Sequence, residues 1–337
     1  MTATLPSSSV TGSLGVPHLK RLWAAAQAAR SGLAARLHDE ARLDRQVLDA
    51  LGLGLHQTWD HLMDKAPTFE DFEAWVVATA GWPDRRCVER LRAAVAGAPP
   101  PDDARSWLES VQASPAVLTD DDLAFWETHG YVVLRQAVCE EVRRNVEQVI
   151  YAHVEATPDD RESWYRRGGR HRIMVELIQH PALEAARRSP RIHKAFAQLW
   201  NTADLWISAD RCGFHPPQRA DHPFPGPDLH WDVNFAQPLS FETQGILYLT
   251  DTPAEQGALT LVPGFHKRLP DWLAALPPGA DPQQQDLHSL GSMPVAAGAG
   301  DMVIWHAWLP HGSRPNLGER PRVVQYINMM PSTFAVA

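Results

Sequence analysis

The sequence of 337 residues predicts an α+β protein, with helices in the first part of the chain and a β-sandwich or jelly roll in the second. Apolar residues recur at helical spacing through much of residues 17–200. After residue 205 the pattern changes to short β-rich runs, separated by turns that contain proline and glycine. Hydrophobic residues make up 44% of the chain, which is enough for a full core. Many short strands with such turns are typical of a sandwich or jelly roll.

The first 116 residues predict a tail, a helical region and a linker. Residues 1–16 are rich in Ser, Thr and Gly, which predicts a flexible tail. Residues 17–97 have a helical pattern, and we expect these helices to pack on the main domain. Residues 98–116 begin with three prolines that cannot continue a helix, so they predict a linker followed by a short helix.

The main domain is predicted at residues 117–333. Thr119 and the three aspartates after it predict a helix start, and Gly130 predicts its end. A strand is expected directly afterwards, and a helical stretch at 137–200. Further strands are predicted at Leu205–Cys212, Gly245–Thr250, Ala258–Val262, Met302–His306 and Arg322–Met330.

Composition excludes several classes of protein. The net charge is −9 and the isoelectric point about 5.9, whereas a nucleic-acid-binding surface needs a basic stripe. The N-terminus lacks the pattern of a secretory signal, and no apolar window is long enough to span a bilayer. Cys87, Cys139 and Cys212 are widely spaced and predict no disulfide framework. We therefore expect a soluble, cytoplasmic protein that binds neither nucleic acid nor membranes.

His230 and Asp232 form a His-x-Asp triplet. In an extended segment, residues i and i+2 point to the same side, so the imidazole and the carboxylate could bind one ion. About one such triplet is expected by chance in a chain with 16 histidines. The triplet alone therefore favours a hydrogen-bonded surface pair over a metal site.

A third candidate ligand, His311, follows the predicted strand Met302–His306. With His230 and Asp232 it would give two imidazoles and one carboxylate, the set that occupies one face of an octahedral Fe(II) and leaves three positions open. Zinc also binds such a set, and a loop histidine with ordinary hydrogen bonds is the alternative for His311. His306 is the competing histidine, but it lies in a bulky apolar strand and is interpreted as core.

Arg322 opens a predicted strand eleven residues after His311, a spacing that allows a tight turn and a return strand. A guanidinium in that place would lie beside the metal. Arginine suits a carboxylate ligand, because its planar fork binds both oxygens and never loses its charge. Arg314 and Arg320 flank it, but they fall in a turn and are expected to be solvated.

From about Leu118 to Pro331 the chain resembles the phytanoyl-CoA dioxygenase family of 2-oxoglutarate oxygenases. The resemblance is carried by LTDDDLAFWETHGYVVLRQAV, the HWD triplet, EQGALTLVPGFHK, GDMVIWHAWLPHGSRPN and the arginine after it. Gly257, Pro263, Gly264 and His266 stand where the family has them. Phe265 departs from the family, which usually has serine before that histidine.

The resemblance implies a double-stranded β-helix, which is a cupin-like jelly roll, with flanking helices and an extra N-terminal helical region. It implies that His230, Asp232 and His311 bind Fe(II) at the mouth of the barrel. Arg322 would bind the distal carboxylate of 2-oxoglutarate, and Ser313 would hydrogen-bond the same group. A serine in a turn more often bonds its own backbone, which is the alternative for Ser313.

The implied activity is a dioxygenase reaction that uses Fe(II), 2-oxoglutarate and O2. It would hydroxylate an unactivated C–H bond of a small-molecule metabolite and release succinate and CO2. Desaturation, cyclisation or epoxidation could follow from the same chemistry, whereas halogenases of this kind lack the carboxylate that Asp232 provides. The alternative is a metal-binding β-barrel that is non-catalytic or independent of 2-oxoglutarate, such as a cupin-type enzyme or a ligand-binding protein.

The substrate is not specified by the sequence. The proline-rich loop 213–228 precedes the HWD triplet and is predicted to form a lid. The basic run 166–172 predicts a solvated surface turn. The N-terminal helices carry no motif, and docking of a carrier protein or partner enzyme is one hypothesis for them. Candidate substrate-lining residues are Arg211, Trp231, Asn234, Phe235 and Trp308.

Overall fold

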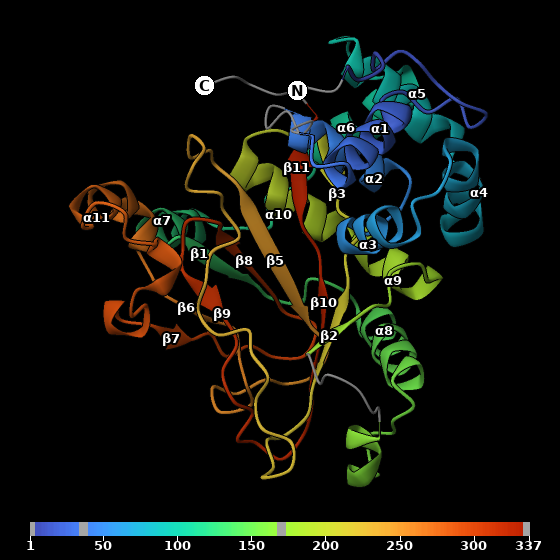
Figure 1. Ribbon diagram of the computed structural model, residues 1–337. Coiled ribbons are helices and arrows are strands. Elements are labelled where there is room, and N and C mark those ends of the chain that lie inside the picture. The colour runs from blue at the N-terminus through green and yellow to red at the C-terminus, as the bar shows by residue number, and fades with distance from the viewer. Residues whose placement is uncertain (1–3, 34–39, 167–172, 333–337) are drawn as a thin grey trace.

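The computed structural model describes residues 4–33, 40–166 and 173–332, and it contains helices and antiparallel sheets as predicted (Figure 1). The basic run predicted as a surface turn lies outside the described residues, apart from Arg166. Within the described ranges, no helix combines the length and the apolar character needed to cross a membrane.

Helices dominate the chain up to residue 200, and strands follow, as the sequence pattern predicts. The N-terminal helices are α1 (Leu19–Arg30), α2 (Ala41–Ala50), α3 (Leu55–Lys65), α4 (Phe69–Ala80), α5 (Arg85–Val95) and α6 (Asp102–Ala113). Later helices are α7 (Asp120–His129), α8 (Glu140–His153), α9 (Pro181–Arg187), α10 (Pro190–Trp200) and α11 (Leu269–Ala275), with short 3₁₀ turns at Arg161–Tyr165, Phe265–Lys267, Pro282–Gln284 and His288–Leu290. The strands are β1 (Tyr131–Leu134), β2 (Met174–Val175), β3 (Leu205–Ile207), β4 (Cys212–His215), β5 (Thr243–Tyr248), β6 (Thr260–Leu261), β7 (Met293–Pro294), β8 (Met302–His306), β9 (His311–Gly312), β10 (Arg322–Tyr326) and β11 (Met329–Pro331).

Helices α1 to α5 share a hydrophobic core with Trp206 of β3, and Figure 1 shows them gathered beside β3. Arg90 of α5 lies at this junction, where it pairs with Asp204 at 2.6 Å and donates to the Leu205 carbonyl at 2.8 Å. Its guanidinium also lies over the Trp206 ring, 4.1 Å from the centroid. The N-terminal helices are therefore joined to the second half of the chain by apolar and charged contacts together.

Residues 4–16 have no helix or strand, but they are anchored to the helices. Glu73 of α4 is buried, and its carboxylate accepts hydrogen bonds from the Ser13 amide, the Ser13 hydroxyl and the Leu14 amide at 2.8–2.9 Å. A buried carboxylate is stable only when such donors surround it. The predicted flexible tail therefore differs from the described residues 4–16, which pack against α4.

The main sheet has six strands in the order β1-β8-β5-β10-β4-β2, and all its neighbours are antiparallel. Side chains alternate between its two faces, as they must along extended strands. On the helix-facing side, which α8, α9 and α10 cover, lie Leu247 of β5, Ile304 of β8 and Val323 of β10. The inner side carries Gln244 of β5, Trp305 of β8 and Arg322 of β10. Each of them lies an odd number of positions from the helix-facing residue named for its own strand.

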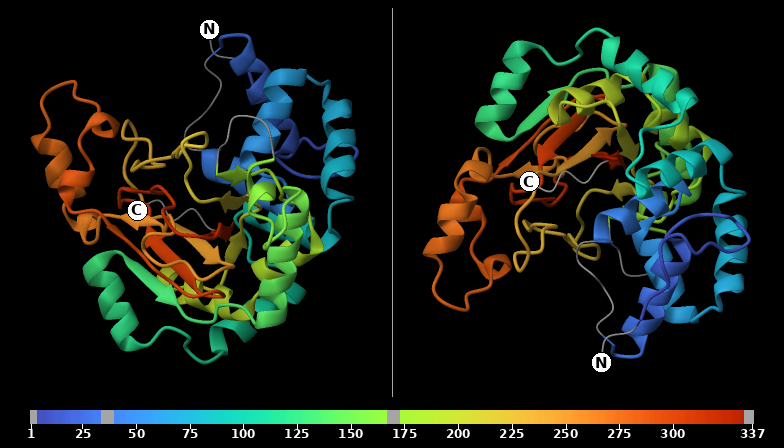
Figure 2. Two further views of the ribbon diagram at one scale, coloured as in Figure 1. Left: turned by 90° about the horizontal axis from the view of Figure 1, so that it is seen from below. Right: turned by 90° about the horizontal axis from the view of Figure 1, so that it is seen from above.

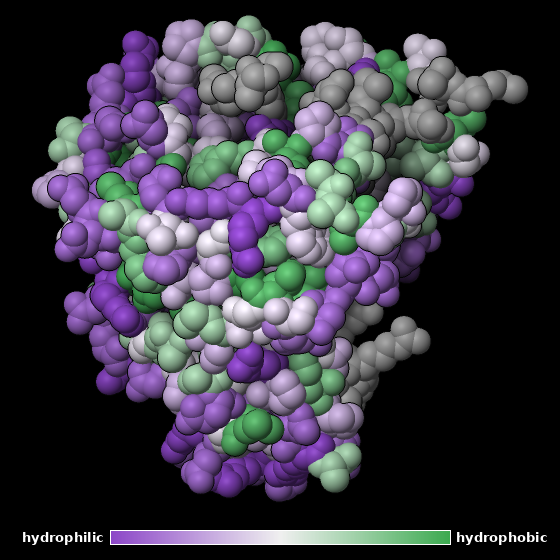
Figure 3. Space-filling view, turned by 90° about the vertical axis from the view of Figure 1, so that its left-hand side faces the viewer, coloured by the Kyte–Doolittle hydropathy of each residue, from purple (hydrophilic) through white to green (hydrophobic). Residues whose placement is uncertain are grey.

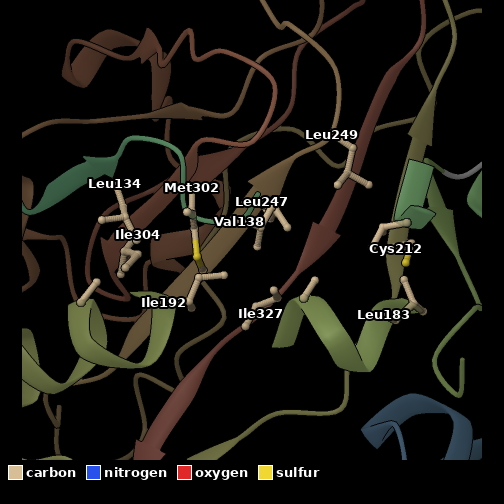
Figure 4. Packing of buried hydrophobic residues seen from close by; sticks show 14 of the residues in the cluster. Leu134, Val138, Leu183, Ile192, Cys212, Leu247, Leu249, Met302, Ile304 and Ile327 are labelled. Atoms are coloured by element: carbon tan, nitrogen blue, oxygen red, sulfur yellow. The ribbon is translucent and has the colours of Figure 1, made fainter. Parts of the chain in front are cut away.

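The helix-facing side forms a closed apolar core. Figure 4 shows Met302 and Ile304 of the sheet packed towards Ile192 of α10, and Cys212 towards Leu183 of α9. All five side chains are completely buried. Burying aliphatic side chains stabilises the fold by about 1.5–3 kcal/mol each, so this face contributes strongly to the stability of the sheet.

The inner side is covered by a second antiparallel sheet, with strand order β7-β6-β9, and by α11. Side chains of both sheets share one hydrophobic cluster, which includes Tyr248 of β5 and Leu261 of β6. The Tyr248 hydroxyl donates to the Val295 carbonyl at 3.2 Å and accepts from the Leu259 amide at 2.9 Å, which ties the two sheets together. Figure 2 shows α11 at the far side of the sheets from the N-terminal helices. The face that carries α11 is mostly hydrophilic, with small hydrophobic areas (Figure 3).

Two predicted strands are wrong as single elements. The run Leu205–Cys212 is divided between β3 and β4, which belong to different sheets, because Asp49 of α2 accepts from the Ala209 amide at 3.1 Å and holds a turn between them. The predicted loop 213–228 therefore begins with three residues of β4. The run Arg322–Met330 is likewise divided between β10 and β11.

Candidate active site

His230, Asp232 and His311 lie together at one end of the sheets. One possible ligand atom from each residue falls within 4.8 Å of the others. The Nε2 atom of His311 is 3.3 Å from one Asp232 oxygen, and the Nε2 atom of His230 is 3.6 Å from the other. The His311 side chain is 6% exposed, whereas that of Asp232 is 56% exposed. The cluster is therefore closed on the side of His311, partly open at His230, whose side chain is 31% exposed, and open on the carboxylate side.

Backbone pairing brings the two histidines side by side. The His230 amide donates to the His311 carbonyl, and the His311 amide donates to the His230 carbonyl, both at 2.9 Å. The imidazole centroids are 4.8 Å apart as a result. His230 and His311 are 81 positions apart in sequence, and this one antiparallel pair of residues brings them together.

Hydrogen bonds fix the tautomer of each imidazole. Nδ1 of His230 lies 2.7 Å from the Asp228 carbonyl oxygen, and Nδ1 of His311 lies 3.1 Å from the Leu309 carbonyl oxygen. A carbonyl oxygen can only accept, so both Nδ1 atoms carry hydrogen. In the neutral rings, each Nε2 then presents a lone pair towards the Asp232 carboxylate. Such an arrangement is the usual support for metal-binding histidines.

Three electron-pair donors at this distance attract a cation. Desolvation alone would raise the pKa of Asp232, but the hydrogen bonds that His230 and His311 donate when their Nε2 atoms carry a proton outweigh it and hold that pKa well below its usual range. Burial opposes charge on His230 as well, yet its bonds to Asp232 and to the Asp228 carbonyl raise the pKa of the imidazole. The electrostatics of the cluster thus favour a positive charge among the three side chains, and a divalent ion would supply it. Two imidazoles and one carboxylate suit Fe(II), and also zinc.

Gln244 is a contact of this cluster that the sequence analysis missed. Its side-chain amide donates to Asp232 at 2.6 Å. It lies on β5, twelve residues after the aspartate, and no residue spacing in the sequence signals the contact. Asp232 lies outside the strands, so only the folded chain shows that the two side chains meet.

Arg322 is almost completely buried, with 1% of its surface exposed. Its guanidinium donates to the Gly257 carbonyl at 2.7 Å and to the Ser313 hydroxyl at 3.1 Å, while its Nε atom is buried without a partner. Within the described part of the chain, no carboxylate forms an ion pair with it. A buried cation without a counter-charge is costly, so this group fits an anionic ligand.

The surroundings of Arg322 are shaped by Gly257 and His215. Gly257 has a φ of +66°, and a Cβ atom there would lie 2.6 Å from the His215 ring, so only glycine is accommodated. His215 is the register partner of Arg322 on β4. Burial, aided by the charge of Arg322, lowers the pKa of His215 to about 2, which keeps this imidazole neutral. Nothing in the sequence pattern singled out His215.

The competing residues lie elsewhere. His306 is buried against Trp126 and Phe241, as its apolar strand predicts, and it is outside the cluster of possible ligands. Arg320 is exposed, as predicted. Arg314 is not fully solvated as expected, since it is half-buried and donates to the Thr260 hydroxyl at 2.8 Å.

Of the candidate substrate residues, the aromatic ones form part of the protein interior. Trp231 is 3% exposed, and its ring packs against Phe235 and Trp272. Its indole nitrogen donates to the Trp308 carbonyl at 2.9 Å. Trp308 lies against His306 and donates to the Ser240 carbonyl, also at 2.9 Å. Trp231 of the HWD triplet therefore contacts both Phe235 and Trp308.

The two polar candidates have local partners of their own. Arg211 is half-buried and faces Glu176 at 3.4 Å and Asp210 at 3.7 Å. Asn234 is exposed, and its side chain accepts from the Ala236 amide at 3.0 Å. Local hydrogen bonding of this kind is what asparagine does in turns.

The predicted lid loop lines a cavity of about 630 Å³, and none of His230, Asp232, His311 and Arg322 is among the residues that line it. Phe224 and Asp228 of the loop face Glu255, His288 and Arg314 across it. Phe224 also stacks on His215, with ring centroids 5.3 Å apart. The loop therefore borders both the Arg322 region and the backbone carbonyl that supports His230.

Comparison with known proteins places this geometry in a family. The family model described as phytanoyl-CoA dioxygenase (PhyH) matches residues 126–324, more than half of the chain. A putative phytanoyl-CoA dioxygenase of Dictyostelium discoideum is 20% identical over 260 residues, covering 62% of this chain and 74% of that protein. The Ava biosynthesis cluster protein O of Aspergillus versicolor is 26% identical over 239 residues, covering 61% and 76%.

Solved structures with a similar arrangement include the epimerase SnoN, crystallised in complex with Fe3+, alpha ketoglutarate and nogalamycin RO. Its sequence is 19% identical and its TM-score is 0.47. The similarity covers 63% of this chain and 83% of SnoN.

Proposed function

The chain belongs to the phytanoyl-CoA dioxygenase family, and on that premise we propose that it is an Fe(II)- and 2-oxoglutarate-dependent oxygenase. It hydroxylates an unactivated C–H bond of a small-molecule metabolite and releases succinate and CO2. The observation that carries the proposal is the pairing of a His–Asp–His cluster with a buried arginine that lacks a counter-charge. The first suits a divalent metal, and the second suits a dicarboxylate cosubstrate.

His230, Asp232 and His311 are the proposed iron ligands. Each imidazole would bind through Nε2, because its Nδ1 hydrogen is held by a backbone carbonyl. Three protein ligands would leave positions on such an ion free for the cosubstrate.

Arg322 and Ser313 are the proposed site for the distal carboxylate of 2-oxoglutarate. The guanidinium is already oriented by the Gly257 carbonyl and the Ser313 hydroxyl, and its Nε hydrogen is free for an acceptor. Burial strengthens a charge-assisted bond and excludes water that would compete for it. Neutral His215 beside the guanidinium adds no second positive charge to the pocket.

When bound, iron and 2-oxoglutarate supply the oxidising chemistry, in which decarboxylation of the cosubstrate is coupled to oxidation of a C–H bond. The protein side chains hold the metal, the cosubstrate and the target carbon in place. Trp231, Phe235 and Trp308 are the proposed apolar wall of the substrate site, while Arg211 and Asn234 are its proposed polar contacts. The loop that carries Phe224 is the proposed lid.

The proposed architecture is a double-stranded β-helix at residues 117–333, formed by the six-stranded and three-stranded sheets. Residues 17–97 form an additional helical region, joined by residues 98–116.

Removing residues 1–116 would expose Trp206 and leave Asp204 without Arg90. We expect the truncated protein to be recovered mainly as aggregate. A truncated protein with wild-type solubility and melting temperature would instead favour a separate docking module for a carrier protein or partner enzyme.

The decisive experiment is anaerobic addition of Fe(II) and 2-oxoglutarate to the metal-free protein, followed by visible absorption spectroscopy. A chelated keto acid gives a weak charge-transfer band, and no substrate is needed to see it. We expect the band in wild type and its loss in Asp232→Ala. Arg322→Met should need far more 2-oxoglutarate, whereas the matched variant Arg320→Met, at an exposed position, should behave as wild type.

A folded wild-type protein that binds Fe(II) but gives no band with 2-oxoglutarate would overturn the oxygenase assignment. The chain would then be a metal-binding β-barrel of another kind. If the band appears, succinate release in a screen of small metabolites identifies the substrate. Product masses then separate hydroxylation, which adds one oxygen atom, from desaturation or cyclisation, which removes two hydrogen atoms.

A further inference from the structure

Gln244 links the exposed carboxylate of Asp232 to the interior of the barrel. Its side-chain Nε2 donates to Asp232 at 2.6 Å, and its Oε1 accepts from the Trp305 indole nitrogen at 3.0 Å. An indole N–H can only donate, so it fixes the orientation of the amide. The amide hydrogens must therefore face the carboxylate.

The link is built into the sheet. Gln244 of β5 and Trp305 of β8 are register partners, and Trp305 is 2% exposed. The Trp305 ring also lies against the imidazole of His311, with centroids 5.2 Å apart. Trp305 thus contacts one proposed ligand directly and a second one through Gln244.

The orientation of the Asp232 side chain depends on the hydrogen bond from Gln244, whereas the two histidines are held by other contacts. Both histidines are held by a backbone bridge and by carbonyl acceptors at Nδ1. The Asp232 side chain is 56% exposed, so packing does not hold its carboxylate in one rotamer. The short bond from Gln244 restricts that rotation without adding charge to the cluster.

We propose that Gln244, oriented by Trp305, is a positioning residue that preorganises Asp232 for metal binding. This inference rests on the proposed metal site. Ordered partners of metal ligands typically change metal affinity by about 10- to 100-fold when they are removed. Gln244 therefore sets metal affinity, while cosubstrate recognition at Arg322 is independent of it.

Co(II) binding to the metal-free protein, followed by its visible absorption, provides a readout that does not depend on turnover. Gln244→Met preserves the length of the side chain and removes both hydrogen bonds, and it should raise the Co(II) dissociation constant by about 10- to 100-fold. Trp305→Phe preserves a ring beside His311 but releases the amide, and it should weaken binding less. The double variant should bind Co(II) no more weakly than Gln244→Met, because both changes break the same chain of contacts.

The matched control is Gln325→Met, which removes a glutamine that donates to the Leu183 carbonyl on the opposite side of the sheet. It should bind Co(II) as wild type does. Melting temperatures of the metal-free proteins show whether the changes act through folding, and a positioning role predicts similar values for Gln244→Met and Gln325→Met.

Three results separate the possible failures. If wild type binds no Co(II), the metal site itself is wrong. If wild type binds and folded Gln244→Met binds equally tightly, Gln244 has only a packing role and the inference is overturned. If Trp305→Phe weakens binding as much in the Gln244→Met background as alone, Trp305 acts through the His311 ring and not through the amide.

Discussion

The two faces of the six-stranded sheet are made by the same strands but contain different chemistry. The helix-facing side carries aliphatic residues such as Leu247 and Ile304, packed under α9 and α10. The inner side carries Gln244, Trp305 and Arg322 among its apolar residues. Gln325 on the first face is a neutral polar residue, whereas the second face contains a buried guanidinium with an unpartnered nitrogen.

This difference indicates how stability and function are divided. Aliphatic burial on the helix-facing side stabilises the strands, so polar groups can be kept on the inner side at some cost in stability. Substitutions on the two faces should therefore separate cleanly into those that change unfolding and those that change ligand binding.

The largest expected effect is on the inner face. Arg322→Met removes the charge that the cosubstrate would pair with, and loss of one partner of a buried ion pair costs about 3–5 kcal/mol. The affinity for 2-oxoglutarate should fall by roughly two to three orders of magnitude, measured by anaerobic titration of the Fe(II) form. The melting temperature without cosubstrate should change little. Unchanged affinity would show that the inner face does not hold the cosubstrate at this residue.

On the helix-facing side, Leu247→Ala should have the opposite profile. Leu247 is completely buried, and creating such a cavity costs about 2–5 kcal/mol of unfolding free energy. Urea denaturation should detect that loss. At a temperature where the variant is folded, its 2-oxoglutarate affinity should match that of wild type. A large loss of affinity in fully folded Leu247→Ala would contradict the division between the faces.

A smaller effect should appear in the pH dependence of stability. Burial lowers the pKa of His306 to about 3, below the ordinary value of about 6.5 for histidine in the unfolded chain. The unfolded state then binds more protons in this interval, so stability is full above pH 6.5 and declines as the pH falls towards 3. His306→Phe should lose less stability between pH 7 and pH 5 in urea titrations. An identical decline in both proteins would mean that His306 does not contribute to it.

The smallest expected effect comes from Gln325, a polar residue on the helix-facing side. It donates to the Leu183 carbonyl at 3.0 Å, while its own Oε1 has no partner. Gln325→Met should lower the unfolding free energy by about 1 kcal/mol, as for a single hydrogen bond. Its 2-oxoglutarate titration should match that of wild type, and a weaker titration would show that this face also influences the site.

Prediction from the sequence was most successful where local patterns determine the outcome. Thr119 caps the start of α7 as predicted, Gly130 ends the helix in a left-handed conformation, and β8 has its predicted bounds. Prediction was least successful where the local structure depends on contact with a segment far away in the sequence. The break between β3 and β4 depends on Asp49 of α2, and the need for glycine at residue 257 comes from its close approach to His215 of β4.

The sequence by itself determined the α+β class, the family resemblance and the order of the histidines, aspartate and arginine, because these depend on residue types and spacings along the chain. Only the tertiary structure decided that Gln244 meets Asp232, that Trp305 orients Gln244, and that the guanidinium of Arg322 is buried with one nitrogen unpartnered. The physical reason is that such contacts join separate segments of the folded chain. Sheet register and burial determine these contacts, and local residue patterns specify neither of them.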